Sequence, residues 1–279
     1  MRAMVIVLAS LGAITSCQAW SQPCPDLPGA AKLFDRPETH VVWVGEQHGT
    51  AQMPAFLTDL ACIAGTRRHP VIVALERADE EQADWNRFLN SDGSTKAVAA
   101  LTRAPAWSLA HDGRTSQAMV TMADRLRQLK QDGRIVDVRL IDRWRRTPED
   151  PNGAHRDQAM ANAVLDIIRA TPDVLVLVYS GNIHAMKRKS AGFPADLPNP
   201  AASYLPAAET VCLNLVGAKG EVWNCQDSGC GSHPYPGESG RARGVVFAGD
   251  SPNAGASESF DAVGYTGVTT TASPPAVGQ

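Results

Sequence analysis

The chain has 279 residues, of which 44% are hydrophobic and 20% are charged. This composition is typical of a globular protein with a substantial core, so it excludes a largely disordered chain and favours one domain over two. The formal net charge is −3, and basic residues cluster only briefly, at residues 143–146 and 187–189. Because a nucleic-acid surface requires a basic stripe, we expect no nucleic-acid partner.

The N-terminus has the pattern of an export signal. Arg2 supplies a positive charge, residues 4–14 are apolar, and small or polar residues follow through Ala19. The apolar stretch is too short to span a bilayer, so we predict a signal peptide over residues 1–19. Residues 14–17, Ile-Thr-Ser-Cys, resemble a bacterial lipobox, which leaves two alternatives: cleavage after Ala19, or lipidation of Cys17 and a membrane anchor. Both predict an exported protein, either periplasmic or an outer-membrane lipoprotein.

Six cysteines are candidates for disulfides in an oxidising compartment. They lie at positions 17, 24, 62, 212, 225 and 230. Cys24 follows the predicted signal and Cys62 lies late in the first predicted helix, so a bridge between them would fasten the N-terminal arm. Cys225 has two alternative partners, Cys212 across a hairpin or Cys230 in a small loop, and the sequence does not choose between them.

Apolar runs of strand length alternate with amphipathic segments through residues 40–179. The predicted strands are 40–44, 71–75, 135–141 and 174–179, and the predicted helices are 53–64, 79–89, 116–131 and 155–169. This alternation is typical of right-handed βαβ units, so we predict an α/β fold with a mainly parallel central sheet flanked by helices. Residues 91–113 form a predicted insertion, and His111 and Arg114 near its end could reach the carboxyl edge of the sheet.

The C-terminal third of the chain has a different pattern. Residues 210–216 and 221–225, on either side of a turn at residues 218–220, predict a β-hairpin. Residues 226–259 are rich in Gly, Ser and Pro, which predicts a flexible segment. We therefore expect a single α/β domain over residues 20–225, followed by that segment and by a C-terminal strand and tail over residues 260–279 that could dock on the domain.

Three predicted strands are followed by polar residues that can carry chemistry. Glu46 and His48 follow the first strand, Glu76 follows the second, and His184 follows the fourth. Because ligands bind beyond the carboxyl ends of the strands in an open parallel sheet, we expect these four side chains to converge in one pocket. Arg156 opens the helix after the third strand, where it would either stabilise an anion in that pocket or pair with nearby charges.

Two imidazoles and two carboxylates in one pocket could support hydrolysis in two ways. Glu46, His48, Glu76 and His184 could bind a divalent ion such as zinc, manganese, iron or cobalt, which would activate a water molecule. Alternatively, His48 or His184 could act as a general base without a metal, with a carboxylate orienting the imidazole. The sequence does not distinguish these mechanisms.

Four motifs carry a family resemblance. They are Gly45-Glu46-Gln47-His48, Ala74-Leu75-Glu76-Arg77, Arg156-Asp157-Gln158-Ala159-Met160-Ala161 and Gly181-Asn182-Ile183-His184-Ala185. Together they resemble the superfamily that joins ChaN-type haem-binding lipoproteins, erythromycin esterase-like enzymes, TIKI and TraB proteins and a domain of the Pasteurella toxin. The resemblance covers about residues 38–190. It implies an α/β fold with both Gly-x-x-His segments at one cleft, and Glu46, His48, Glu76 and His184 as functional residues.

The branches of that superfamily imply different activities. TIKI proteins look like metal-dependent proteases, erythromycin esterases hydrolyse a macrolide lactone, and ChaN proteins bind haem. We expect an exported, metal-dependent hydrolase of an ester, lactone or amide in a small molecule or peptide. Its predicted catalytic residues are Glu46, His48, Glu76, Arg156 and His184, and all but Arg156 are also the predicted metal ligands. The alternative is a ChaN-like lipoprotein that binds haem or iron without catalysis, and a third interpretation is an inactive member with a buried polar network.

Overall fold

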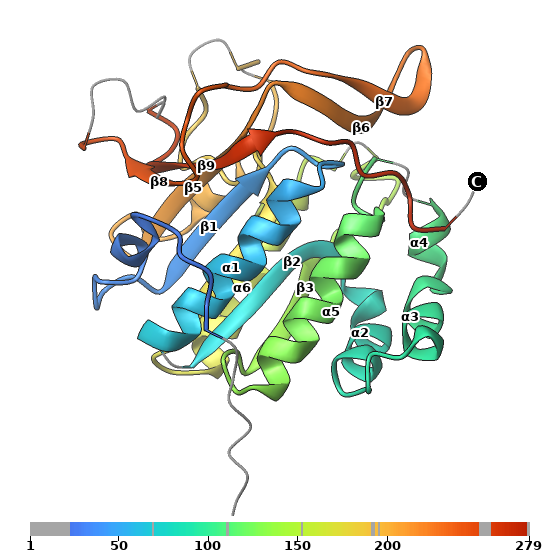
Figure 1. The fold of residues 1–279 in the computed structure, drawn as a ribbon, viewed down its shortest axis with the longest axis horizontal. Coiled ribbons are helices and arrows are strands. Elements are labelled where there is room, and N and C mark those ends of the chain that lie inside the picture. Colours follow the sequence, from blue (N-terminus) through green and yellow to red (C-terminus); the bar gives the residue numbers. More distant parts are fainter. Residues whose placement is uncertain are drawn as a thin grey trace, which may run out of the picture.

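Seven strands form a central sheet in the order β3-β2-β4-β1-β5-β9-β8 (Figure 1). The strands are β1 (Val41–Glu46), β2 (Val71–Ala78), β3 (Asp137–Asp142), β4 (Leu175–Gly181), β5 (Thr210–Ala218), β8 (Gly244–Phe247) and β9 (Ala262–Thr269). All neighbouring pairs are parallel except β8 with β9. This arrangement confirms the predicted α/β fold class and its mainly parallel sheet.

The structure is a computed structural model that describes residues 23–68, 70–109, 112–151, 153–190, 193–194, 196–250 and 258–277. The predicted signal peptide, Cys17 and His111 lie outside these residues. Among the helices that are described, none is long and apolar enough to cross a membrane.

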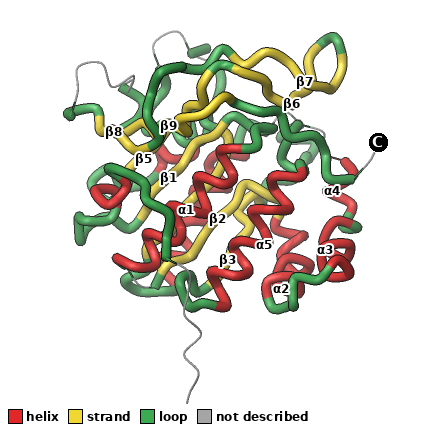
Figure 2. The backbone as a smooth tube through the Cα atoms, viewed as in Figure 1, coloured by secondary structure: helices red, strands yellow, loops and turns green. Residues whose placement is uncertain are grey.

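Helices cover both faces of the sheet (Figures 1 and 2). They are α1 (Gln52–Arg67), α2 (Gln82–Leu89), α3 (Thr95–Thr102), α4 (Pro105–Leu109), α5 (Gln117–Gln131) and α6 (Arg156–Ala170), with 3₁₀ turns η1 (Ala30–Leu33), η2 (Asp79–Glu81) and η3 (Ala201–Tyr204). Val42 and Val44 of β1 share one core with residues of α1 and α5, whereas Val41 and Trp43 share a second core with residues of α6. Successive side chains of a strand point to opposite faces, so β1 is covered on both sides.

The predicted hairpin between residues 210–216 and 221–225 does not form, and a hairpin lies one strand later in the chain. β5 lies inside the sheet between β1 and β9, and it is buried along most of its length, as expected of an interior strand. The antiparallel pair is formed instead by β6 (Gly220–Gln226) and β7 (Gly229–Tyr235). This two-stranded ribbon lies over the carboxyl edge of the sheet (Figure 1).

The segment over residues 226–259 is more regular than its composition predicts. It contains β7 and β8, and residues 251–257 lie outside the described part of the chain. β8 pairs with β9, and β9 extends the sheet beyond β5. The predicted C-terminal strand is therefore part of the central sheet.

Two disulfides are present among the described cysteines. Cys24 is bonded to Cys62 of α1, as predicted, and Cys225 is bonded to Cys230 across the β6–β7 hairpin. The second bridge settles the choice that the sequence left open. Cys212 is a free thiol buried in β5.

Candidate functional site

The carboxyl ends of three adjacent strands, β2, β4 and β1, bring the predicted residues together. Glu46 is the last residue of β1, and His184 lies in the turn after β4. Glu76 lies where the pairing of β2 with β3 shifts register, and such irregularities re-aim side chains at functional edges. With His48 and Arg156, these residues form one network of hydrogen bonds and ion pairs.

His48 lies between two carboxylates. Its Nδ1 is 2.7 Å from Oε1 of Glu46, and its Nε2 is 3.4 Å from Oε2 of Glu76. Burial opposes the charged ring, but the charge of Glu76 and the hydrogen bond to Glu46 outweigh burial and raise the pKa of His48 from 6.5 to about 10. At neutral pH His48 is therefore an imidazolium, with an N–H directed at each carboxylate.

Glu76 is the centre of the network, with 3% of its side chain exposed. Its Oε2 accepts a hydrogen bond of 2.7 Å from the backbone N–H of Gly181. Its Oε1 accepts one of 3.2 Å from Nη1 of Arg114 and one of 2.6 Å from Nη2 of Arg156. Burial by itself would raise the pKa of Glu76, but the imidazoles and guanidinium around it outweigh burial and hold the pKa well below 4.5.

His184 has a different environment from His48. Its Nδ1 is 2.8 Å from Oδ1 of Asp157, and its Nε2 is 3.0 Å from Nη1 of Arg156. A guanidinium has only donors, so Nε2 must accept from Arg156 and the ring proton must lie on Nδ1, where it is donated to Asp157. Asp157 is itself fixed by the backbone N–H of Ala201, 2.8 Å from the same oxygen. Nε2 of His184 also lies 3.6 Å from Oε1 of Glu76, so this nitrogen faces the centre of the network.

The two imidazoles share a space above Gly181 at the end of β4. A Cβ added at Gly181 would lie 3.0 Å from Nε2 of His48, 3.5 Å from Oε2 of Glu76 and 3.6 Å from Cδ2 of His184. The absence of a side chain at this position therefore leaves open the point at which the three functional groups meet.

Gly45 leaves room for close packing between β1 and the turn after β4. It lies within β1, and an added Cβ would be 2.8 Å from the Cβ of Ala185 and 2.8 Å from the Cα of Asn182. A side chain here would separate β1 from the segment that carries His184. Gly49, in the loop after β1, has a positive φ of 84°, which glycine adopts without strain.

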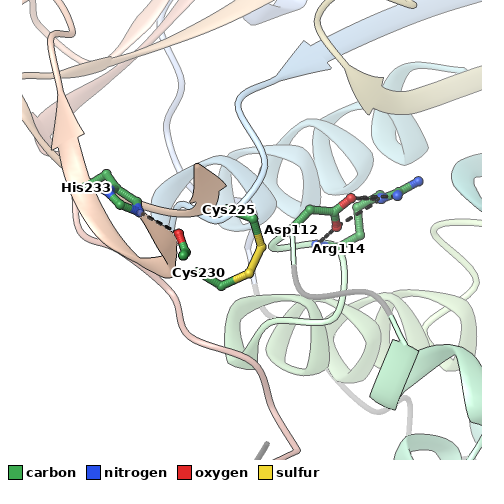
Figure 3. The surroundings of a disulfide bond; sticks show 6 residues. Asp112, Arg114, Cys225, Cys230 and His233 are labelled. Carbon is green, nitrogen blue, oxygen red and sulfur yellow. Dashed lines mark hydrogen bonds and ion pairs between the residues drawn. A yellow bond between two sulfur atoms is a disulfide. The ribbon is translucent and has the colours of Figure 1, made fainter. Parts of the chain in front are cut away.

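A cleft of about 520 Å³ opens beside Glu76. Its lining residues are Glu76, Arg77, Ala78, Glu81, Ala106, Asp112, Arg114, Thr115, Asp142 and Cys225. Figure 3 shows the Cys225–Cys230 disulfide of the hairpin beside Asp112 and Arg114, which lie in the segment before α5. The β6–β7 hairpin thus supplies a wall of the cleft, and the volume is in the range of small-molecule sites.

Two functional neighbours were not predicted. Asp157 is in the first turn of α6, which favours an acidic residue for helix reasons alone, and the sequence gives no sign that it would bond His184. Tyr179 has its hydroxyl buried in β4, where it donates to Oε2 of Glu46. Its position two residues before Gly181 places it on the same face of the strand as the site, and this is the one signal that could have identified it.

The predicted role of Arg156 changes in detail. Its Nε and Nη2 donate to Oδ2 of Asp142, at 3.0 and 2.6 Å, and its remaining contacts go to Glu76 and His184. Arg156 is therefore engaged by the protein's own carboxylates rather than free to clamp an external anion. Asp142, the polar residue that ends β3, is the fourth strand-end member of the network.

The arrangement of donors does not fit a divalent metal at the four predicted ligands. Both ring nitrogens of His48 face carboxylate oxygens, and the free lone pair of His184 accepts from Arg156. Arg114 and Arg156 already bond to Glu76, in positions where a metal would otherwise neutralise it. Within the described ranges, no group of three or more His, Cys, Asp or Glu residues has a geometry that could hold an ion.

No protein-family profile matches this chain, and no curated protein matches it. Solved structures are similar in fold. A succinoglycan biosynthesis protein aligns with a TM-score of 0.66 and 10% identity, over 91% of this chain and 93% of its own. A mutant of the erythromycin esterase EreC in its open conformation aligns with a TM-score of 0.62 and 12% identity, over 87% and 93% of the two chains. A Bacillus cereus protein aligns with a TM-score of 0.54 and 10% identity, over 86% and 91%.

These identities show a shared fold and no more. The neighbours confirm the α/β fold that the family resemblance implies, because an erythromycin esterase is among them.

Proposed function

We propose that this protein is an exported hydrolase that cleaves an ester or lactone bond in a small molecule, and that it does so without a metal ion. The observation that carries the proposal is a pair of imidazoles with different partners at one space beside buried Glu76: His48 lies between two carboxylates, and Nε2 of His184 faces Arg156. A base beside a charged hydrogen-bond donor can activate water and stabilise the oxyanion that the attack on a carbonyl creates. The two disulfides support export, because such bonds persist in oxidising compartments.

His184 is the proposed general base. When a water molecule takes the place of Nη1 of Arg156 at Nε2, Arg156 keeps its bonds to Asp142 and Glu76 through its other nitrogens. The water oxygen attacks the carbonyl carbon, and its proton passes to Nε2 of His184. Asp157 holds the ring in the required tautomer and stabilises the imidazolium that forms. The same proton then goes to the leaving alkoxide, which leaves the acid and the alcohol as products.

His48 is the proposed stabiliser of the oxyanion. Its imidazolium is held between Glu46 and Glu76, and 20% of its side chain is exposed, so it can redirect one N–H to a substrate oxygen. It keeps its proton throughout the reaction. Preorganised charge of this kind contributes more in a partly buried site than in water.

Haem binding is supported less well by the cleft. Six of its ten lining residues are charged: Glu76, Arg77, Glu81, Asp112, Arg114 and Asp142. Haem iron takes a His, Cys, Met or Tyr ligand, and the one such side chain among these lining residues, Cys225, is held in a disulfide. We therefore place hydrolysis ahead of haem binding.

A panel of ester and lactone substrates tests the proposal. His184→Asn should lower kcat by roughly 10²–10⁴-fold, because it removes the base, and His48→Gln should lower it by a comparable factor. His233→Gln is the matched control, because His233 lies on β7 and contacts the carbonyl of Gly229. Activity of His184→Asn within twofold of the parent would contradict the assigned base.

Chelation tests the metal-free mechanism separately. Treatment with a strong chelator should leave the rate unchanged, since guanidinium groups occupy the positions beside Glu76. A loss of activity that added zinc or manganese restores would instead support the metal-dependent alternative.

A further inference from the structure

The chain after β9 crosses the loops that carry two site residues. Residues 270–276, which we call the strap, run from the end of β9 past the first turns of α1 and α5 (Figure 1). His48 lies in the loop before α1, and Arg114 lies in the loop before α5. The strap makes backbone hydrogen bonds to both loops, and isolated bridges pair Thr50 with Ala272 and Ser116 with Pro275.

The contacts on the His48 side involve the residues directly after it. The N–H of Ser273 donates to the carbonyl of Gly49 at 2.8 Å, and the N–H of Ala51 donates to the carbonyl of Thr271 at 2.9 Å. The carbonyl of Gly49 accepts a second bond, of 3.0 Å, from the N–H of Trp223 in β6. Strap and hairpin therefore meet at one peptide of the His48 loop.

The contacts on the Arg114 side cap α5. Ser116 is the N-cap residue, but its side chain makes no capping bond. The first helical N–H groups donate to the strap instead, Gln117 to the carbonyl of Pro274 and Ala118 to Oγ of Ser273, each at 2.9 Å. These donors would otherwise be unsatisfied, because the first turn of a helix has no internal acceptors for them.

The two loops also press against each other. A Cβ added at Gly113 would lie 2.2 Å from the backbone nitrogen of Gly49, so the loops are in backbone contact next to His48 and Arg114. Ser273 is 4% exposed and is the strap residue that bonds both loops, through its N–H on one side and its hydroxyl on the other.

We propose that the strap is a positioning element of the site and that Ser273 is its positioning residue. It fixes the spacing of His48 and Arg114, both of which must reach Glu76. The effect on catalysis rests on the proposed hydrolase function, whereas the coupling of the two loops does not. A displacement of about 1 Å in such a site can cost about 10²-fold in rate, so a remote cap can control kcat.

Ser273→Ala in the full chain tests this proposal. The substitution removes only the hydroxyl that caps α5. Amide hydrogen exchange should accelerate at Ala118 and also at Ala51 and Trp223, which report the far side of the strap. In the hydrolysis assay kcat should fall at least tenfold, with KM changed less than threefold. The matched control is Val268→Thr, a surface substitution of similar shape at 54% exposure near the end of β9, which should change neither readout.

The outcomes separate the two proposals. Faster exchange confined to Ala118 would show that the strap does not couple the loops, and it would overturn the inference. If exchange accelerates at Ala51 and Trp223 as well as at Ala118, but the protein hydrolyses no ester or lactone, the positioning role of the strap would be supported and the proposed hydrolase function would be contradicted. If Ser273→Ala does not fold, Ala276→Pro provides the same test, because it removes a single 2.9 Å bond, from the N–H of residue 276 to the carbonyl of Thr115. Exchange in that variant should also reach Ala51.

Discussion

At the scale of single residues, the charge on His48 is set by its neighbours. Its side chain is held by Glu46 and Glu76 at 2.7 and 3.4 Å, and its pKa is raised from 6.5 to about 10. A group whose pKa is higher in the folded state stabilises the fold fully below its unfolded value and loses that contribution as pH rises through the folded value. The relevant window therefore lies between pH values of about 6.5 and 10.

This shift predicts a pH dependence of both stability and activity. The free energy of unfolding, measured in urea, should decline as pH rises towards about 10, and His48→Gln should be less stable at neutral pH but flatter across that window. Hydrolysis should likewise fall near that pH, when the oxyanion loses its charged donor. A parent protein whose stability does not change across this range would show that His48 is not held as an imidazolium.

Gly181 offers a steric test of the site. In Gly181→Ala the new methyl group would lie 3.0 Å from Nε2 of His48, in the space that the two imidazoles share. We expect kcat to fall by about 10²-fold, because water and substrate cannot reach both rings. Circular dichroism should show an unchanged fold. The neighbouring Ser180→Ala is the comparison, since it removes the 2.8 Å bond from the indole of Trp43 and should cost roughly 1–3 kcal/mol of stability instead.

At the scale of elements, the two disulfides close loops of different length. Cys24–Cys62 joins residues 38 apart in sequence, whereas Cys225–Cys230 joins residues five apart within the β6–β7 hairpin. The first ties the N-terminal segment to α1, and the second stiffens the tip of the hairpin at the cleft wall. Loop entropy makes the longer bridge the more stabilising of the two.

Replacing each pair by serine should reveal that order. Loss of Cys24–Cys62 should lower the free energy of unfolding by roughly 4 kcal/mol and loss of Cys225–Cys230 by roughly 2 kcal/mol, on the loop-entropy estimate. Urea titration of the two double variants measures both values. An equal or reversed order would mean that the hairpin bridge acts through native packing at the cleft rather than through the unfolded chain.

At the scale of the whole molecule, the last strand completes the fold. β9 pairs with β5 in parallel and with β8 antiparallel, and Ala262 and Val263 of β9 are buried. Close packing extends across the sheet, because a Cβ at Gly264 would lie 2.6 Å from Leu215 and 3.1 Å from Phe56 of α1. The region over residues 20–225 therefore lacks part of its own sheet.

A chain that ends at residue 225 should not fold cooperatively. It would expose the edge of β5, remove the strap from α1 and α5, and uncover the apolar surface that β9 buries. Far-UV circular dichroism and urea unfolding should show no sharp transition. A cooperative transition in this truncated chain would contradict this expectation and support the domain over residues 20–225 that the sequence pattern predicts.

The strand-end rule explains why much of the site could be predicted. Glu46, Glu76 and His184 each follow an apolar run of strand length, and parallel strands expose their carboxyl ends at one edge. The partners that decide the chemistry could not be predicted in the same way. Asp157 lies 27 residues before His184 in the sequence and on another element. Only the folded structure shows that the two side chains are in contact.

The sequence by itself determined the α/β class, the mainly parallel sheet and the set of acids and imidazoles that follow its strands. These features depend on local periodicity, which is written in neighbouring residues. Only the tertiary structure decided that β5 joins the sheet, that Arg114 and Arg156 reach Glu76, and that the C-terminal strap caps α5. Those contacts join distant segments through burial and charge pairing, and no local pattern in the chain encodes them.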